Sequence, residues 1–183
     1  MLKVASETDK EGLAEHTLFR HESLKRKIYN AENESDVRQS FLALYDLDLV
    51  GNLEKYRIDY VSPDLWLEFK YSIDLSDRRV RCRVLSQILH YLHYAPTKRG
   101  ELILPETFGI VDKTNIILYD TCKFLAYIIN PHYFKDIKSP SQSHPDLEKA
   151  LFSDPIITSD LMHVLSDYDQ VWNEFEKRGV YDN

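Results

Sequence analysis

Apolar and polar positions alternate along two neighbouring stretches in the first half of the chain. Residues 55–61 are rich in aromatic and β-branched side chains, and residues 65–71 place an apolar side chain at every second position. Ser62-Pro63-Asp64 between them is typical of a turn, because proline presets the backbone angle of the second turn position. The pattern therefore predicts an antiparallel hairpin, with a loop from Ser62 to Leu65.

Other stretches repeat apolar residues every three or four positions, which indicates helices. The clearest runs from 76 to 94, where Ser76 or Asp74 caps the start and Pro96 follows the end. The elements predict an α/β fold, a mixed β-sheet flanked by helices. The remaining predictions are helices at about 10–31, 34–46, 146–152 and 159–178, strands at 101–104, 108–111 and 115–119, a helix or strand at 121–129, and a loop at 138–145.

The predicted hairpin carries charged side chains that meet at one point. An antiparallel ribbon with this loop sets Asp59 across from Glu68, with Cβ atoms about 5 Å apart. Because side chains alternate along a strand, Glu68 and Lys70 leave the same face, opposite to that of Leu67. Asp64 lies about 13 Å from Glu68 along the strand, which is too far to share an ion.

Two carboxylates and a lysine at one point are what a Mg²⁺-dependent phosphodiesterase requires. Mg²⁺ keeps several waters and binds one or two carboxylates together with substrate phosphate. We expect Asp59, Glu68 and the backbone carbonyl of Phe69 to be metal ligands. Lys70 would orient or deprotonate the attacking water and stabilise charge at phosphorus. The plainer alternative is a solvated cluster of charges across two strands.

Gln87 stands in the apolar stripe of the 76–94 helix, where an apolar residue is expected. An amide that faces a core needs a hydrogen-bond partner. Tyr91 follows four residues later and therefore lies on the same face of the helix. The alternative is a glutamine at the rim of an amphipathic helix.

Taken in chain order, Asp59, Glu68-Phe69-Lys70 and Gln87-x-x-x-Tyr91 resemble the motifs of the PD-(D/E)xK nuclease superfamily, in particular its RecB-type branch. The resemblance covers about residues 34–119. It implies a restriction-endonuclease-like fold, with Asp59 and Glu68 as metal ligands, Lys70 as a catalytic residue, and Gln87 and Tyr91 supporting the site. Arg57-Ile58 departs from the Gly or Pro that many members have near the aspartate, which bears on the subfamily more than on the site.

The resemblance also implies a further acidic residue on an upstream helix. Glu34-Ser35-Asp36-Val37-Arg38 is similar to the Glu-x-x-x-Arg helix of restriction-type members. We expect Glu34 to reach toward the metal, with Glu22 on the preceding helix as the substitute candidate. Acidic residues also favour the first turn of any helix, which is the alternative explanation for Glu34.

The function implied by the resemblance is that of a Mg²⁺-dependent DNA endonuclease domain in which Mn²⁺ can substitute. The closest context is the nuclease region of single-chain restriction–modification enzymes, where methyltransferase and target-recognition modules read the sequence. Two alternatives remain open: a non-catalytic binding or assembly module that keeps the fold, and an RNA-directed nuclease. Double-strand cleavage by a one-site domain usually needs two copies, so the resemblance allows a transient dimer.

The charge balance bears on the partners. A net charge of −7 is unusual for a protein that binds DNA alone. Residues 145–183 hold nine acidic and three basic residues, which leaves residues 1–144 near neutral. Either a partner supplies the affinity for DNA, or the acidic tail covers the site until assembly. We expect an arginine cluster at the start of the 76–94 helix to contact DNA, with a solvated basic turn as the alternative: Arg78, Arg79, Arg81 and Arg83.

Length and composition predict one folded domain. With 183 residues, 43% of them hydrophobic and only five glycines, the chain is long and apolar enough to bury a core. We expect a nuclease core over 1–138 and a helical extension over 139–183 packed on the same domain. The charged start of the chain and the short apolar runs predict a cytoplasmic protein without a membrane partner.

The cysteines and two helical histidines suggest no further site. Cys82 and Cys122 lack metal-ligand spacing, and we expect both to be reduced thiols. His90 and His93 are three residues apart on a helix, but no third zinc ligand with suitable spacing follows. They are expected to pack or to lie at the surface.

Overall fold

The computed structural model describes residues 7–47, 58–95, 97–98 and 101–182. It divides into two compact units, Met1–Asp48 and Leu49–Asn183. The first unit contains α1 (Glu7–Tyr29) and α2 (Glu34–Leu44), which confirms both predicted helices. The Asn33 side chain caps α2 by accepting a hydrogen bond from the backbone N–H of Asp36.

The second unit is built on a five-stranded sheet in the order β1-β2-β5-β6-β7. The β2 and β5 strands are parallel, and all other pairs are antiparallel, so the sheet is mixed. This confirms the predicted α/β class. The strands are β1 (Tyr60–Val61), β2 (Leu65–Phe69), β5 (Thr107–Val111), β6 (Asn115–Asp120) and β7 (Met162–His163), with a separate ribbon of β3 (Thr97–Lys98) and β4 (Glu101–Leu102).

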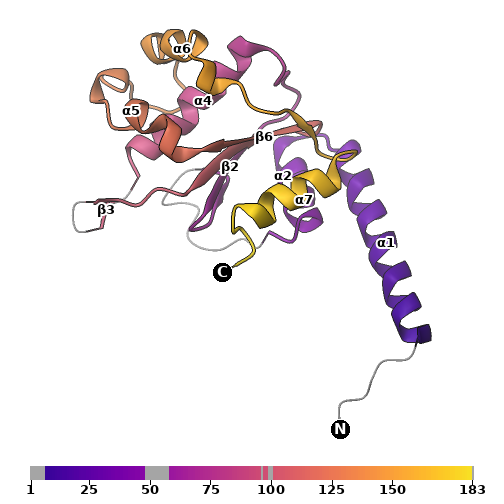
Figure 1. The fold of residues 1–183 in the computed structure, drawn as a ribbon. Coiled ribbons are helices and arrows are strands. Elements are labelled where there is room, and N and C mark those ends of the chain that lie inside the picture. The colour runs from indigo at the N-terminus through magenta and orange to yellow at the C-terminus, as the bar shows by residue number, and fades with distance from the viewer. Residues whose placement is uncertain (1–6, 48–57, 96, 99–100, 183) are drawn as a thin grey trace. The chain divides into compact units, whose positions relative to one another are not determined.

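Helices cover both faces of this sheet (Figure 1). The helices α4 (Arg78–His93), α5 (Leu125–Ile128) and α6 (Pro145–Phe152) lie on one face, and α7 (Tyr168–Lys177) lies on the other. A continuous apolar core fills the space beneath α4. Each strand contributes every second side chain to it, and each helix contributes every third or fourth. Its members include Trp66, Ile110 and Ile117 from the sheet, Leu85, Ile88 and Leu89 from α4, and Leu147 and Leu151 from α6.

The hairpin forms, but its first strand is shorter than predicted. The β1 strand pairs Tyr60 with Leu67 and Val61 with Trp66. Ser62 closes the turn, since its backbone N–H donates to the carbonyl of Leu65 at 2.9 Å. Ile58 and Asp59, immediately before Tyr60, form a bend rather than part of β1, and 55–57 lie outside the described residues.

The start of α4 differs from the prediction. Asp77 caps the helix by accepting a hydrogen bond from the N–H of Arg79 at 2.8 Å. Asp74 instead accepts from the N–H of Ser76 at 2.9 Å, within the turn before the helix. Ser76 and Asp74 therefore satisfy each other, and the helix begins two residues later than predicted.

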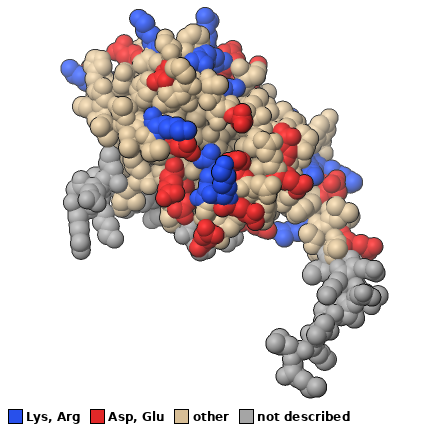
Figure 2. Space-filling model, viewed as in Figure 1, with Lys and Arg blue, Asp and Glu red and all other residues tan. Residues whose placement is uncertain are grey.

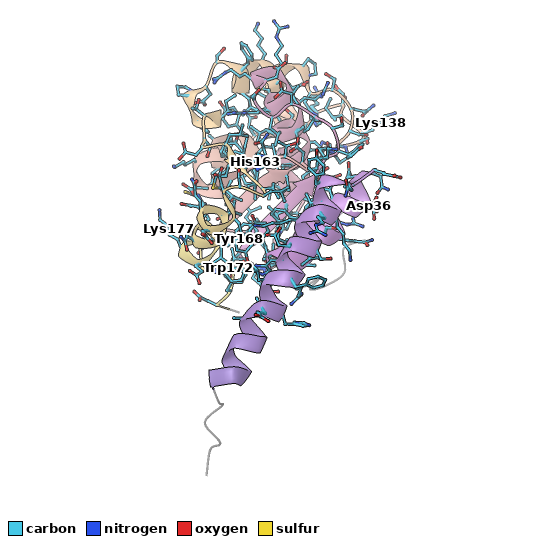
Figure 3. The ribbon with its side chains drawn as sticks, turned by 90° about the vertical axis from the view of Figure 1, so that its right-hand side faces the viewer. Asp36, Lys138, His163, Tyr168, Trp172 and Lys177 are labelled. Atoms are coloured by element: carbon cyan, nitrogen blue, oxygen red, sulfur yellow. The ribbon has the colours of Figure 1, made fainter. Side chains whose placement is uncertain are left out.

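The predicted helix at 159–178 is wrong in its first half. Residues Met162–His163 form β7, which continues the sheet by pairing with β6. His163 then redirects the chain: its N–H donates to the Asp167 carboxylate at 2.6 Å, and its Nδ1 accepts from the N–H of Ser166 at 3.0 Å. Only then does α7 begin, with Tyr168 and Trp172 on successive turns (Figure 3).

The 121–129 stretch, which the sequence left open between a helix and a strand, is helical. A 3₁₀ helix at Thr121–Phe124 leads into α5, and two further 3₁₀ helices lie at Pro131–Tyr133 and Pro155–Ile157. Residues beyond 138 belong to the same unit as the sheet, because β7 extends the sheet and α6 packs on α4. Across the described ranges, no helix has both the length and the apolar character needed to cross a membrane.

Candidate functional site

The edge of the sheet brings the two predicted acidic residues to neighbouring positions. The β1–β2 register of Tyr60 with Leu67, continued by one residue, sets Asp59 across from Glu68. The Asp59 carboxylate accepts a hydrogen bond from the backbone N–H of Phe69 at 2.7 Å. A side-chain oxygen thus occupies a place in the ladder that a backbone carbonyl usually fills, which fixes this carboxylate beside β2.

Glu68 lies at the centre of the polar cluster and is only 3% exposed. Lys70 donates from Nζ to Glu68 Oε1 at 2.7 Å, and Gln87 donates from Nε2 to the same oxygen at 2.9 Å. One carboxylate oxygen therefore accepts hydrogen bonds from its own strand and from α4. Such charge-assisted bonds are stronger than neutral ones and hold the carboxylate in a single orientation.

This arrangement explains why an amide interrupts the apolar stripe of α4. The β2 face that carries Glu68 also carries Trp66, which lies in the core beneath α4. The face is therefore covered by the helix, rather than open to solvent as the hairpin alone suggests. A buried carboxylate needs hydrogen-bond donors, and Gln87 supplies one from the helix that covers it.

Tyr91 joins the same cluster one helical turn after Gln87. Burial raises the pKa of the Tyr91 hydroxyl, and the Glu68 and Asp59 charges act in the same direction. A hydrogen bond with Gln87 and the Lys70 charge lower it. These influences require the phenol to lie near all four groups, so α4 and the hairpin bring together the five side chains that the motif named.

The four arginines at the start of α4 divide into two pairs. Arg78 donates from Nε to the carbonyl of Phe152 at 2.7 Å and from Nη2 to that of Asp154 at 3.0 Å. Arg81 donates to the carbonyl of Leu75. These two side chains tie the helix to other segments of the protein. The prediction that the cluster contacts DNA stays a prediction. Arg79 and Arg83 are exposed.

The acidic residues of the first unit stay untested as ligands. Glu34 is the first residue of α2, and Glu22 lies on α1, 3.8 Å from Lys25. In the part of the chain that the structure describes, no three His, Cys, Asp or Glu side chains converge as a metal centre. Two carboxylates suffice for Mg²⁺, which completes its shell with water and phosphate, but they do not make a structural zinc site.

The backbone of β2 turns the Phe69 carbonyl toward the side on which Asp59 lies. The N–H of Lys70 donates to Val111 on β5, whereas the N–H of Phe69 donates to Asp59 on the other side. Because the N–H and C=O of one strand residue point in the same direction, the Phe69 carbonyl also points toward the Asp59 side. All three donors are oxygens, and this set suits a hard cation such as Mg²⁺ or Mn²⁺.

A buried histidine pair was missed by sequence reasoning. His90 Nδ1 lies 2.9 Å from His144 Nε2, across 54 residues of sequence. Burial, with the neighbouring His144 and His93, lowers the pKa of His90 to about 4. His93 Nδ1 lies 2.6 Å from the carbonyl of Ile128. These histidines pack α4 against later segments, as expected, and local spacing held no signal for His144.

A second polar group lies at the opposite end of the strands. Arg178 donates from Nη1 to Asp120 at 2.7 Å and to the Thr107 hydroxyl at 3.2 Å. Thr107 pairs with Leu65 at the start of β2, whereas Glu68 is near its end. Lys123 and Arg178 hold the pKa of Asp120 below its usual range. A cavity of about 550 Å³ opens beside this group, away from the Glu68 cluster.

Acidic side chains dominate another part of this unit. Figure 2 shows them gathered on the face that carries α7, whose sequence contributes Asp169, Glu174 and Glu176. A polyanion is repelled by such a face. The exposed Arg79 and Arg83 on α4 are therefore better placed, by charge, to meet a phosphate.

Comparison of the chain with protein-family models, curated proteins and solved structures found no match. Function must therefore be inferred from the side chains. The cluster offers two fixed carboxylates, a lysine ammonium and an amide on rigid elements. Two exposed arginines, Arg79 and Arg83, precede Gln87 on α4. This combination can hold a hard cation, orient a water and neutralise charge on a phosphate.

Proposed function

We propose that this chain is a Mg²⁺-dependent DNA endonuclease domain with a restriction-endonuclease-like fold, and that it hydrolyses phosphodiester bonds with an activated water. The observation that carries the proposal is the convergence of Lys70 and Gln87 on one oxygen of Glu68, beside the fixed Asp59 carboxylate. The hairpin and the helix bring the members together in the order that the motif requires.

Each side chain has a distinct role in this proposal. Asp59, Glu68 and the Phe69 carbonyl would hold the cation, which when bound supplies Lewis acidity and a more acidic water. Lys70 orients that water and stabilises the charge that develops at phosphorus. Gln87 is a positioning residue, because it acts on substrate only through the carboxylate that it holds. Tyr91 packs beside Gln87 and helps to exclude bulk solvent.

The charge balance requires help with substrate binding. The net charge of −7 disfavours tight binding of DNA by the chain alone. We therefore include in the proposal a methyltransferase or target-recognition module that delivers the DNA, and transient pairing of two copies where both strands are cut. The cation itself offsets part of the repulsion, because it bridges carboxylates and phosphate.

The proposal is tested with the full chain and supercoiled plasmid in Mg²⁺ or Mn²⁺. We expect metal-dependent nicking that Lys70→Ala abolishes at temperatures below its melting transition. This variant should stay folded but melt at a lower temperature, because it leaves the buried Glu68 carboxylate without the Lys70 ammonium. The matched control is Lys123→Ala, which removes an exposed lysine that pairs with Asp120 at 2.9 Å and should leave nicking unchanged. Nicking that persists in Lys70→Ala, in a preparation free of contaminating nuclease, would overturn the proposal.

A non-catalytic binding module is the second candidate, and the acidic net charge favours it. It predicts no metal-dependent cleavage of any nucleic acid, and partner affinity that Asp59→Ala leaves unchanged. An RNA-directed nuclease is separated from a DNA endonuclease by competition: unlabelled RNA, rather than DNA, should then inhibit cleavage of a labelled strand.

A further inference from the structure

One row of side chains runs along α4 from its exposed start to the buried cluster. Arg79, Arg83, Gln87 and Tyr91 are spaced four residues apart, and such rows form a ridge on a helix surface. Burial increases along the ridge, since the two arginines are exposed and the last two residues are half-buried. The ridge thus leads from solvent to the oxygen of Glu68 that Gln87 contacts.

The neighbouring arginines are excluded from this row by their own contacts. Arg78 lies over the ring of Phe152 at 5.6 Å and bonds two backbone carbonyls, and Arg81 bonds the carbonyl of Leu75. Their side chains are engaged within the protein. Of the four arginines at the start of α4, Arg79 and Arg83 are the two that are exposed to solvent. The acidic residue nearest to them in sequence, Asp77, is engaged as the cap of the helix.

We infer that one strand of the nucleic acid lies along this ridge, with Arg83 and Arg79 contacting the first and second phosphates on one side of the phosphate that is cut. This inference rests on the proposed function, because it takes the Glu68 cluster as the position of the cut. Residues four apart rise by about 6 Å along a helix, a step comparable with the separation of successive phosphates in a strand. A planar guanidinium suits phosphate oxygens, which it can contact with two hydrogen bonds.

The ridge narrows the substrate class from phosphodiesters in general to polynucleotide strands. A dinucleotide or a small phosphodiester that is cut at the Glu68 cluster has no further phosphate to extend to either arginine. A polynucleotide with two phosphates beyond the cut reaches both. The ridge therefore selects for strand length, and it does so without contacting any base, so its binding is independent of sequence.

Salt dependence of binding tests the ridge directly. A fluorescein-labelled single-stranded oligodeoxynucleotide of 12 thymidines is titrated with the full chain in EDTA, at several KCl concentrations. Removing one arginine that binds a phosphate should reduce the slope of log K against log salt by about 0.7 for a single strand. We expect this reduction in Arg79→Ala and in Arg83→Ala, roughly twice as much in the double variant, and about tenfold weaker binding for each.

Two control variants make this result specific. Arg78→Ala should lower the melting temperature, because it removes the hydrogen bonds to two backbone carbonyls, and it should leave the slope unchanged. Lys138→Ala removes one exposed positive charge from a loop outside α4 and should also leave the slope unchanged. Wild-type slopes in Arg79→Ala and Arg83→Ala, or an equal reduction in Lys138→Ala, would overturn the ridge.

Strand length gives a positional readout. With Mn²⁺, the kcat/KM for cutting should rise as two phosphates are added on one side of the cut, and then level off. Arg79→Ala should remove the gain from the outer phosphate, and Arg83→Ala the gain from the inner one. A length dependence that both variants retain overturns the ridge while Lys70-dependent cutting still supports the nuclease. Reduced slopes without any cutting show that the two arginines bind phosphates, but they overturn the nuclease and with it the placement of these phosphates beside a cut.

Discussion

Two ion pairs of the same length lie at opposite ends of the sheet. Glu68–Lys70 and Asp120–Arg178 each join a carboxylate oxygen and a nitrogen 2.7 Å apart. Their partners differ in sequence separation, because Lys70 is two residues from Glu68 whereas Arg178 is 58 residues from Asp120. They also differ in burial: the Glu68 side chain is 4% exposed and the Asp120 side chain 38%.

The Asp120–Arg178 pair is a structural contact. Arg178 follows α7 and bonds the end of β6 and the start of β5, so it fastens a late helix to the sheet. Lys70 directly follows the strand that carries Glu68, so their pairing joins no distant segments. Burying the Glu68 carboxylate costs several kcal/mol, and the Gln87 bond from α4 offsets part of that cost. Buried carboxylates of this kind gather at functional sites, which is how the proposed function interprets this pair. Two ion pairs of the same length are therefore explained differently: one as a contact of the fold, the other as part of the proposed site.

The largest effect is expected from removing both charges of the buried pair. Glu68→Gln/Lys70→Met should reduce metal-dependent cleavage by about 10³-fold, because an electrostatic element of the site is removed. Its free energy of unfolding should stay unchanged or rise by about 1 kcal/mol, since replacing a buried ion pair is often neutral or stabilising. Plasmid nicking and urea unfolding measure the two effects. A loss of several kcal/mol would assign this pair to the fold.

The His90–His144 pair extends the comparison of the two ion pairs, because it links distant segments without carrying a charge. The folded His90 is protonated only near pH 4, whereas an unfolded histidine is protonated near 6.5. The unfolded state therefore binds more protons between these values, and stability should fall as pH falls from about 6.5 to about 4, by up to about 3 kcal/mol. Urea unfolding at pH 7.5 and pH 5 measures the change.

The control for this pH effect is His90→Gln, which should flatten the dependence while weakening the protein at every pH. This substitution removes the imidazole whose Nδ1 lies 2.9 Å from His144 Nε2. If wild type and His90→Gln lose the same stability between pH 7.5 and pH 5, the acid sensitivity belongs to other groups.

A smaller effect is expected from the exposed pair. Asp120→Asn/Arg178→Met should lower the free energy of unfolding by about 1–2 kcal/mol, since half-exposed ion pairs contribute modestly but Arg178 also bonds Thr107 and Glu174. Cleavage per folded molecule should be unchanged, because the Glu68 cluster lies near the other end of β2. Thermal melting and nicking of the same preparation provide both values. Loss of cleavage below the melting transition would contradict the assignment.

The smallest effect concerns affinity for the cation. Lys70 and a divalent ion are both positive and would bind the same carboxylate, so Lys70→Met should bind Mn²⁺ more tightly, by about tenfold or about 1.4 kcal/mol. Isothermal titration without nucleic acid measures this, and Asp59→Asn should lose binding. Weaker binding in Lys70→Met would mean that Lys70 helps to build the cation site rather than compete for it.

Local pattern was sufficient for much of the fold and for the grouping of the site. The Ser62-Pro63-Asp64 turn fixed the hairpin register, and Gln87 within an apolar stripe indicated a buried polar partner. Two features of the fold did not follow from the local pattern. Asp77 rather than Ser76 caps α4, because Ser76 is already held by Asp74. The two residues of β7 are too few to carry a period.

Long-range contacts explain the remaining differences. Arg78 looked like part of a basic surface, but its partners come from segments more than 70 residues away. His144 meets His90 across 54 residues, and no spacing rule links them. Neither contact has a local signature, since each depends on how α6 docks against α4.

The Asp59 side chain completes the edge of the ladder, because it accepts a hydrogen bond from the Phe69 N–H with 2.7 Å between oxygen and nitrogen. One hydrogen bond therefore holds both the edge of β2 and a carboxylate of the pair, and the Phe69 amide proton lies in it. The hydrogen-exchange rate and the chemical shift of the Phe69 amide proton should therefore change when a cation draws the Asp59 carboxylate away from it. This change can be measured even in a protein that turns over no substrate.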